Sequence, residues 1–258
     1  MKRRYKLLIG FLITGIFLIT IFFITKDKKV YYLSLGDSLA AGQTPNNSIG
    51  LSYGDYVSEY LKDKEALEFY TKSFAKSGYR SIDLLDDLKN NKTIKINGKS
   101  LTIKHALIKA DIVTLSIGSN DLFYKLNIGN EFDLNEFDDI YTYVDESIKD
   151  IDKLLYELRK SCKEQIMVFG FYNPFTAFSS TLANTVEPVI LYANNKMEDL
   201  VRKYDMTYVD IHDMFLANDN YLPKKLEIHP TTLGYKACLL YTSPSPRDVE
   251  ESRMPSSA

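Results

Sequence analysis

Apolar runs that alternate with segments of helical spacing predict an α/β protein with a mostly parallel sheet and helices on both faces. Five runs are typical of core strands, because they are short, apolar and followed by turn residues. They are residues 30–35, 67–74, 110–117, 165–171 and 207–210. Ligands of open parallel sheets bind at the carboxyl ends of the strands, so a functional site is expected in the turns that follow these runs.

Between the runs, apolar residues recur at the spacing of amphipathic helices. The helical intervals are 53–61, 81–88, 137–158 and 186–203, with one further helical turn at 211–215. Ser81 is expected to cap the second of these helices. Residues 93–103 alternate on both sides of Asn97-Gly98 instead, which predicts a β-hairpin inserted beside the core sheet.

Length and composition favour one globular domain with short attachments. The chain has 258 residues, of which 45% are hydrophobic and 26% charged, enough for one good core. A formal net charge of -2 and a pI of about 6.0 give no global basic field for a nucleic acid partner. The two cysteines and three histidines lack the spacing of a disulfide framework or a metal site. We therefore expect no metal, no cofactor and buried or incidental thiols.

The N-terminus predicts a membrane anchor. Residues 1–6 are basic and are followed by an uncharged apolar run over 7–25. At about 1.5 Å per residue, a helix over this run spans the roughly 30 Å hydrocarbon core. The run exceeds a usual signal peptide core and lacks a small-residue cleavage pattern at its end, which favours an uncleaved anchor. The denser positive charge before the run places residues 1–6 in the cytoplasm and the domain outside.

The last segment, residues 238–258, changes character. It is rich in Ser and Pro and shows no periodicity, and it resembles a translated sequencing adapter. A naturally disordered tail is the alternative. We expect the folded domain to cover residues 30–237.

The turn after the first strand carries Gly36-Asp37-Ser38, and residues 39–41 are compatible with a helix. A glycine permits a tight turn, and a serine at a helix start meets free N–H groups and the positive dipole end. Such a hydroxyl can be presented to a substrate and stabilised as an anion. The alternative is that Asp37 or Ser38 is only a helix cap.

Three further motifs accompany this turn. Residues 74–78 (FAKSG) end the second strand, residues 117–121 (IGSND) end the third, and residues 229–235 (HPTTLGY) lie near the end of the chain. With residues 36–39 (GDSL), these ordered blocks resemble the SGNH hydrolase superfamily, also called GDSL esterases and lipases. The resemblance implies a flavodoxin-like three-layer α/β/α sandwich with a five-stranded sheet.

The resemblance also implies a role for each motif residue. Ser38 is the nucleophile and His229 the general base. The oxyanion donors are the main-chain N–H groups of Ser38 and Gly78 together with the side-chain amide of Asn120. The residues that we interpret as structural hydrogen-bonders of these turns are Asp37, Ser119 and Asp121.

The acid of the triad is where the chain departs from the family. The family usually places Asp three residues before the histidine, but this chain has Leu226 there, and the nearest carboxylate is Glu227. Either Glu227 orients His229, or a main-chain carbonyl near Leu226 does, or the site is a Ser-His dyad. We favour the carbonyl or the dyad, because a shift of one residue along a turn swings a side chain to a different side.

His212 is a competing base, since Asp210 and Asp213 flank it. It lacks the proline and the glycine-containing helix start that follow His229. We interpret His212 as a surface residue after the fifth strand.

The expected function is a membrane-anchored, extracytoplasmic serine esterase that forms an acyl-enzyme on Ser38. Substrates from small acyl esters to lipid or envelope-glycan esters present the same carbonyl to this machinery. The alternative, motivated by the missing Asp, is a surface binding module that keeps the fold without turnover. Fluorophosphonate labelling of Ser38 distinguishes the two.

Overall fold

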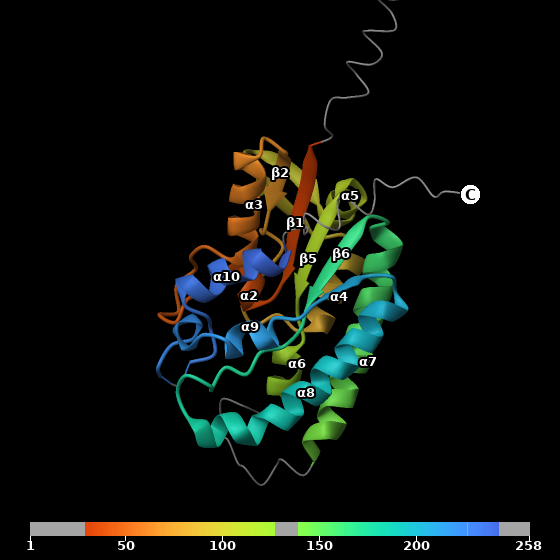
Figure 1. The fold of residues 1–258 in the computed structure, drawn as a ribbon. Coiled ribbons are helices and arrows are strands. Elements are labelled where there is room, and N and C mark those ends of the chain that lie inside the picture. Colours follow the sequence, from red (N-terminus) through yellow and green to blue (C-terminus); the bar gives the residue numbers. More distant parts are fainter. Residues whose placement is uncertain (1–28, 127–138, 226, 243–258) are drawn as a thin grey trace, which may run out of the picture.

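The computed structural model describes residues 29–126, 139–225 and 227–242 (Figure 1). The predicted basic segment 1–6, the predicted anchor 7–25 and residues from 243 onward lie outside the described residues. So does Phe137, where the long helix was expected to begin. Among the helices in the described ranges, none combines the length and the apolar composition that a bilayer crossing needs.

A parallel sheet forms the centre of the fold, as the sequence predicts. Its five strands are β1 (Val30–Gly36), β2 (Leu67–Thr71), β5 (Ile112–Ser116), β6 (Gln165–Phe169) and β7 (Thr207–Val209). Their order in space is β2-β1-β5-β6-β7. The winding direction therefore reverses between β1 and β5, and in doubly wound sheets the crevice at such a reversal is the usual ligand site.

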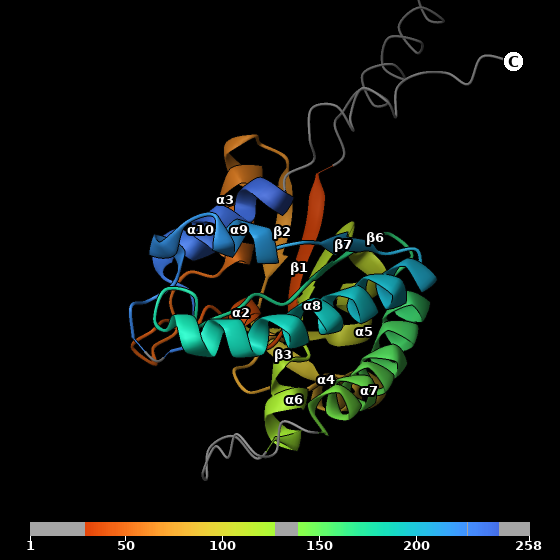
Figure 2. The same ribbon diagram turned by 60° about the horizontal axis from the view of Figure 1, so that its bottom comes forward.

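Helices cover both faces of the sheet, which confirms the predicted three layers (Figure 2). The helices of one layer are α4 (Ser81–Lys89), α5 (Ile103–Lys109), α7 (Ile140–Ser161) and the C-terminal half of α8 (Ser180–Lys203). Those of the other are α3 (Tyr53–Asp63), α9 (His212–Leu216) and α10 (Thr232–Thr242). Successive residues of a strand point to opposite faces, so Ile166 and Val168 of β6 enter the first core while Met167 and Phe169 enter the second.

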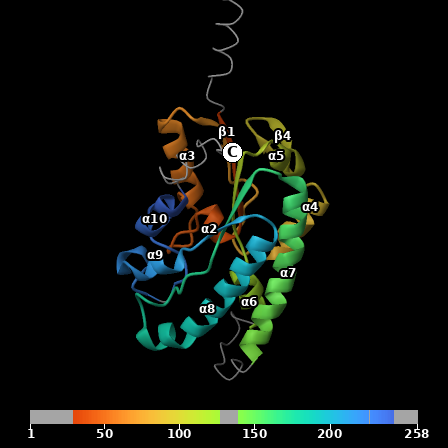
Figure 3. The ribbon, with the colours of Figure 1, turned by 45° about the vertical axis from the view of Figure 1, so that its right-hand side comes forward.

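Three short helices lie near the carboxyl ends of the strands. They are α2 (Ser38–Ala41) after β1, α6 (Ser119–Lys125) after β5, and the 3₁₀ helix η2 (Asp219–Tyr221) between α9 and α10. Figure 3 shows α2, α6 and α9 on the same side of the molecule as the ends of β1 and β5.

The predicted hairpin is confirmed as a separate two-stranded sheet. Its strands are β3 (Thr93–Ile96) and β4 (Lys99–Thr102), which pair antiparallel. Asn97 and Gly98 both have positive φ, 50° and 78°, as a two-residue type I′ turn requires.

Helix α8 begins earlier than the sequence predicts. It runs from Ser180, whereas the expected helical interval begins at residue 186. Ser179 caps it, because its hydroxyl accepts a hydrogen bond from the Leu182 N–H. The polar first turns and the internal Pro188 conceal the helical periodicity.

Helix α10 continues past the domain boundary expected at residue 237. It extends to Thr242, and Cys238 is fully buried in the second core. Five residues of the segment that we separated from the domain, 238–242, therefore belong to a helix of the domain.

Ser81 does not cap α4, contrary to the prediction. Arg80 holds the N-cap position. The main-chain N–H and the hydroxyl of Ser81 both donate to the carboxylate of Asp121 instead. Ser81 therefore links the start of α4 to the turn after β5.

β1 and β5 pack closely at Gly36. The Asp37 N–H donates to the Ser116 carbonyl at 2.9 Å, and Gly36 has a φ of +125°. A Cβ atom on Gly36 would lie 1.8 Å from the carbonyl oxygen of Ser116, which is backbone and cannot move aside. Only glycine fits at this position.

We predict that Gly36→Ala destabilises the protein by more than about 4 kcal/mol, because its methyl group collides with the Ser116 carbonyl. Gly98→Ala is the matched control. Gly98 also has positive φ, but nothing lies within 4 Å of its added Cβ, so we expect a cost of about 1 kcal/mol. Urea unfolding followed by circular dichroism measures both, and equal losses would contradict the steric argument.

Candidate active site

Ser38 lies in the turn that joins β1 to α2, where it is partly exposed and lines a pocket. Asp37 is the N-cap of α2, and its carboxylate accepts hydrogen bonds from the Leu39 N–H at 3.0 Å and from the Ser116 hydroxyl. Burial raises the pKa of Asp37 to about 6, although these two hydrogen bonds act to lower it. Asp37 is thus the structural hydrogen-bonder that the sequence predicts, and it leaves Ser38 free to face the pocket.

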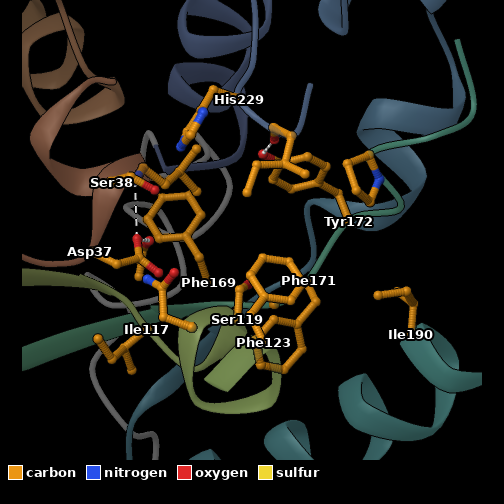
Figure 4. A pocket seen from close by; sticks show the side chains of 16 residues that line it. Asp37, Ser38, Ile117, Ser119, Phe123, Phe169, Phe171, Tyr172, Ile190 and His229 are labelled. Carbon is orange, nitrogen blue, oxygen red and sulfur yellow. Dashed lines mark hydrogen bonds between the residues drawn. The ribbon is translucent and has the colours of Figure 1, made fainter. Parts of the chain in front are cut away.

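His229 lines the same pocket and pairs with Glu227. Its Nδ1 lies 2.6 Å from Oε1 of Glu227. The carboxylate therefore orients the ring through Nδ1, and Nε2 takes no part in this contact. Figure 4 shows His229 near Ser38 at one side of the pocket. The preference for a main-chain carbonyl or a dyad is wrong for this geometry, because the carboxylate two residues before His229 reaches the ring.

The same oxygen of Glu227 also accepts the N–H groups of Ile228 at 2.8 Å and of His229 at 3.1 Å. Partial burial acts to raise the pKa of Glu227, but the hydrogen bonds from the His229 ring and these two N–H groups outweigh it. The pKa of Glu227 therefore lies below its usual value. The carboxylate is ionised at neutral pH and can accept a hydrogen bond from the Nδ1–H group of His229.

Asn120 is the second residue of α6, and it lines the same pocket as Ser38. Its Nδ2 donates to the Tyr79 carbonyl at 2.9 Å. An amide nitrogen carries two hydrogens, so one N–H of Asn120 remains for a ligand.

Gly78 does not line this pocket; it lies exposed in the turn after β2, with a φ of +82°. Two bonds hold that turn near the site: Lys76 N–H donates to the Gly36 carbonyl at 3.0 Å, and Tyr79 accepts from Asn120. Within the described ranges, neither Gly78 nor Ser38 gives its N–H to a main-chain acceptor. Of the two, only Ser38 belongs to the lining of the pocket.

Tyr172 is a site residue that sequence reasoning missed. It follows β6, lines the pocket and donates its hydroxyl proton to the carbonyl of Ile228, between Glu227 and His229. Its ring stacks on Phe215 with 4.2 Å between centroids. An aromatic run such as 169–172 is typical of a core strand, and nothing in it indicates a contact with residue 228.

His212 is buried, not at the surface as predicted. Only 5% of it is exposed. Its Nε2 lies 2.8 Å from Glu187 of α8 and its Nδ1 lies 3.1 Å from Asp213. Glu187 in turn accepts from the buried Asn173 amide at 2.8 Å. This second His-Glu pair does not line the pocket, and it joins α9, α8 and the loop after β6.

Neither cysteine belongs to the lining of the pocket. Cys162 and Cys238 are both buried, and neither forms a disulfide within the described residues. Across the described part of the chain, His, Cys, Asp and Glu side chains nowhere gather in threes as a metal ion would need.

Comparison with known proteins places this site in a family. Residues 34–237 match the model of the GDSL-like Lipase/Acylhydrolase family. The uncharacterized protein YpmR of Bacillus subtilis (strain 168) is 26% identical over 218 residues, which cover 82% of this chain and 79% of that protein.

Two solved structures share the fold. The lipase Lip_vut3 from a goat rumen metagenome has a TM-score of 0.61 at 20% identity, with 81% of this chain and 94% of that chain covered. The acetylxylan esterase Axe2 from Geobacillus stearothermophilus has a TM-score of 0.57 at 18% identity, with 84% and 94% covered. Because the family match spans most of the chain and contains all four motifs, this protein belongs to the GDSL-like lipase and acylhydrolase family.

Proposed function

We propose that the protein is a serine esterase that hydrolyses carboxylic esters through an acyl-enzyme on Ser38. The observation that carries the proposal is that Ser38, Asn120 and His229 line one pocket while Glu227 holds the His229 ring. Nucleophile, base, orienting acid and oxyanion donor are the parts that acyl transfer needs.

In the first half of the reaction, His229 Nε2 takes the proton of the Ser38 hydroxyl as its oxygen attacks the ester carbonyl carbon. The negative charge that develops on the carbonyl oxygen is stabilised by the Ser38 N–H and the Asn120 amide, which line the pocket, and by the Gly78 N–H of the neighbouring turn, the third donor that the family resemblance implies. Glu227 stabilises the imidazolium ion, which then gives its proton to the leaving alcohol as the C–O bond breaks. Water repeats these steps on the acyl-enzyme and releases the acid.

The substrate class is an ester with an acyl group of small or medium size. Apolar and aromatic side chains form most of the pocket wall, among them Phe123, Phe169, Phe171 and Ile190. Two proteins with a similar fold are named a lipase and an acetylxylan esterase. A lipid ester or an envelope glycan ester is accordingly the candidate substrate of this protein.

We predict that the purified full chain hydrolyses p-nitrophenyl butyrate and that Ser38→Ala lowers kcat by at least about 10³-fold, because the nucleophile is lost. A fluorophosphonate probe should label the native chain at Ser38 and leave Ser38→Ala unlabelled. Ser119→Ala, a hydroxyl lining the same pocket, is the control and should be labelled. A folded native chain that neither turns over nor labels would favour the binding-module alternative.

We predict that Glu227→Gln lowers kcat by about 10³- to 10⁴-fold with little change in KM, since the neutral amide no longer stabilises the imidazolium. Steady-state kinetics on p-nitrophenyl butyrate measures this. Glu187→Gln, which alters the His212 pair outside the pocket, is the matched control and should stay within about threefold. A loss of less than tenfold in Glu227→Gln, about 1.4 kcal/mol, would return the orienting role to the main chain.

We also propose that residues 7–25 anchor the protein in the cell membrane as a single pass, with the esterase domain on the extracytoplasmic side. The apolar run and the basic residues before it support this. In a bacterial host the full chain should sediment with membranes, and external protease should digest its domain in spheroplasts. Recovery of the uncleaved full chain in the soluble fraction would refute the anchor.

A further inference from the structure

A second, apolar crevice opens beside the catalytic pocket. It lies between α6, α7 and α8, and the residues that line it are Gly118, Ser119, Leu122, Val144, Ser147, Ile148, Ile151, Phe171, Val189, Ile190 and Ala193. Most of these side chains are aliphatic. The Ser147 hydroxyl donates to the Tyr143 carbonyl at 2.8 Å, so its hydrogen-bond donor is already satisfied without a ligand. The crevice therefore suits a hydrocarbon.

The crevice adjoins the catalytic pocket, with which it shares part of its wall. Ser119, Phe171 and Ile190 line both. The boundary between the two leaves no room for a side chain at Gly118. A Cβ atom there would lie 2.8 Å from Ile151 Cδ1 and 3.0 Å from Phe171 Cζ. Without a side chain at residue 118, Phe171 and Ile151 pack directly against the turn that carries Asn120.

The orientation of an ester in the pocket follows from the catalytic groups. Its leaving oxygen must lie next to His229, which protonates it, and its carbonyl oxygen must lie next to Asn120. In Figure 4, His229 and Ser38 lie at one side of the pocket, and Phe171 and Ile190 lie at the other. The alcohol thus leaves on the side of His229, and the acyl chain points toward the junction with the crevice.

We propose that this crevice is the acyl-chain site of the enzyme and that it selects a medium-length, unbranched acyl group over acetate. The inference rests on the proposed function, because it uses the ester orientation set by Ser38, His229 and Asn120. It narrows the substrate class from small or medium acyl esters to lipid-like acyl esters.

The test is a series of p-nitrophenyl esters from acetate to octanoate with the purified full chain. Each methylene that enters the crevice should raise kcat/KM by up to about fourfold, the equivalent of about 0.8 kcal/mol. Ala193 lines the crevice and is buried. Ala193→Leu should fill the crevice and lower kcat/KM for p-nitrophenyl octanoate at least tenfold. The kcat/KM for p-nitrophenyl acetate should stay within threefold of the native value.

Asn195→Leu is the matched control, because it adds a leucine at an exposed position of the same helix. It should leave the whole chain-length profile within threefold of the native one. If Ala193→Leu loses acetate hydrolysis as well, Val144→Phe on the facing helix α7 replaces it with the same expected result. A native profile that does not rise with chain length, or one that neither crevice variant changes, overturns the proposal.

A binding measurement separates this proposal from the proposed function. In the Ser38→Ala chain, which needs no turnover, octanoate should bind at least tenfold more tightly than in Ser38→Ala combined with Ala193→Leu, as measured by calorimetry. Equal affinities overturn the acyl-chain site even in an active esterase. A tenfold difference together with an inactive native chain upholds the site and rejects the esterase.

Discussion

The close approach of β1 and β5 at their carboxyl ends is the constraint on which the site depends. Gly36 lies directly against the Ser116 carbonyl, and Asp37 binds Ser116 through both its N–H and its carboxylate. The turns after the two strands are thereby held next to each other, and one carries Ser38 while the other carries Asn120. The fold accepts a buried carboxylate with a raised pKa at Asp37 to keep this junction. Burying a charged group is costly unless hydrogen bonds compensate it.

The turn that contains His229 places the carboxylate of Glu227, two residues earlier, against the imidazole ring. A single oxygen of Glu227 accepts the ring Nδ1–H and two consecutive main-chain N–H groups. The carboxylate therefore shapes the turn and pairs with the ring at once. Tyr172 holds the same turn from the other side through the Ile228 carbonyl. This arrangement explains how a carboxylate displaced by one position still reaches the imidazole.

The parts of the structure that were predicted correctly are those that depend on local patterns. The five strands, the hairpin at Asn97-Gly98 and the strand-end positions of Ser38 and Asn120 follow from periodicity and turn chemistry. Burial between distant elements carries no such signal. The sequence around His212 is typical of a surface residue, because nothing in it indicates that Glu187 of α8 lies against the ring.

The start of α8 and the role of Ser81 were wrong for related reasons. Polar residues at 180–185 and the internal Pro188 hide a helix that tertiary packing stabilises. Ser81 has the residue type of a cap, but the buried Asp121 carboxylate offers its hydroxyl and N–H a stronger acceptor than a helix end does. The carboxylate of Glu227 was misjudged because the path of a turn fixes where a side chain points, and spacing alone does not.

The turn after β5 connects the site to the rest of the domain, and each of its residues has a different neighbour. Gly118 leaves room for Phe171 and Ile151, Ser119 lines both pockets, and Asn120 lines the pocket of Ser38 while it donates to the Tyr79 carbonyl. Asp121 is buried and binds Ser81. The segment 75–81, which contains Gly78, is thus tied to this turn at residues 79 and 81 and to β1 at residue 76. A movement of the turn would displace Asn120, the loop that contains Gly78 and the wall shared by the two pockets together, so the fold links the proposed oxyanion donors to the proposed acyl-chain site.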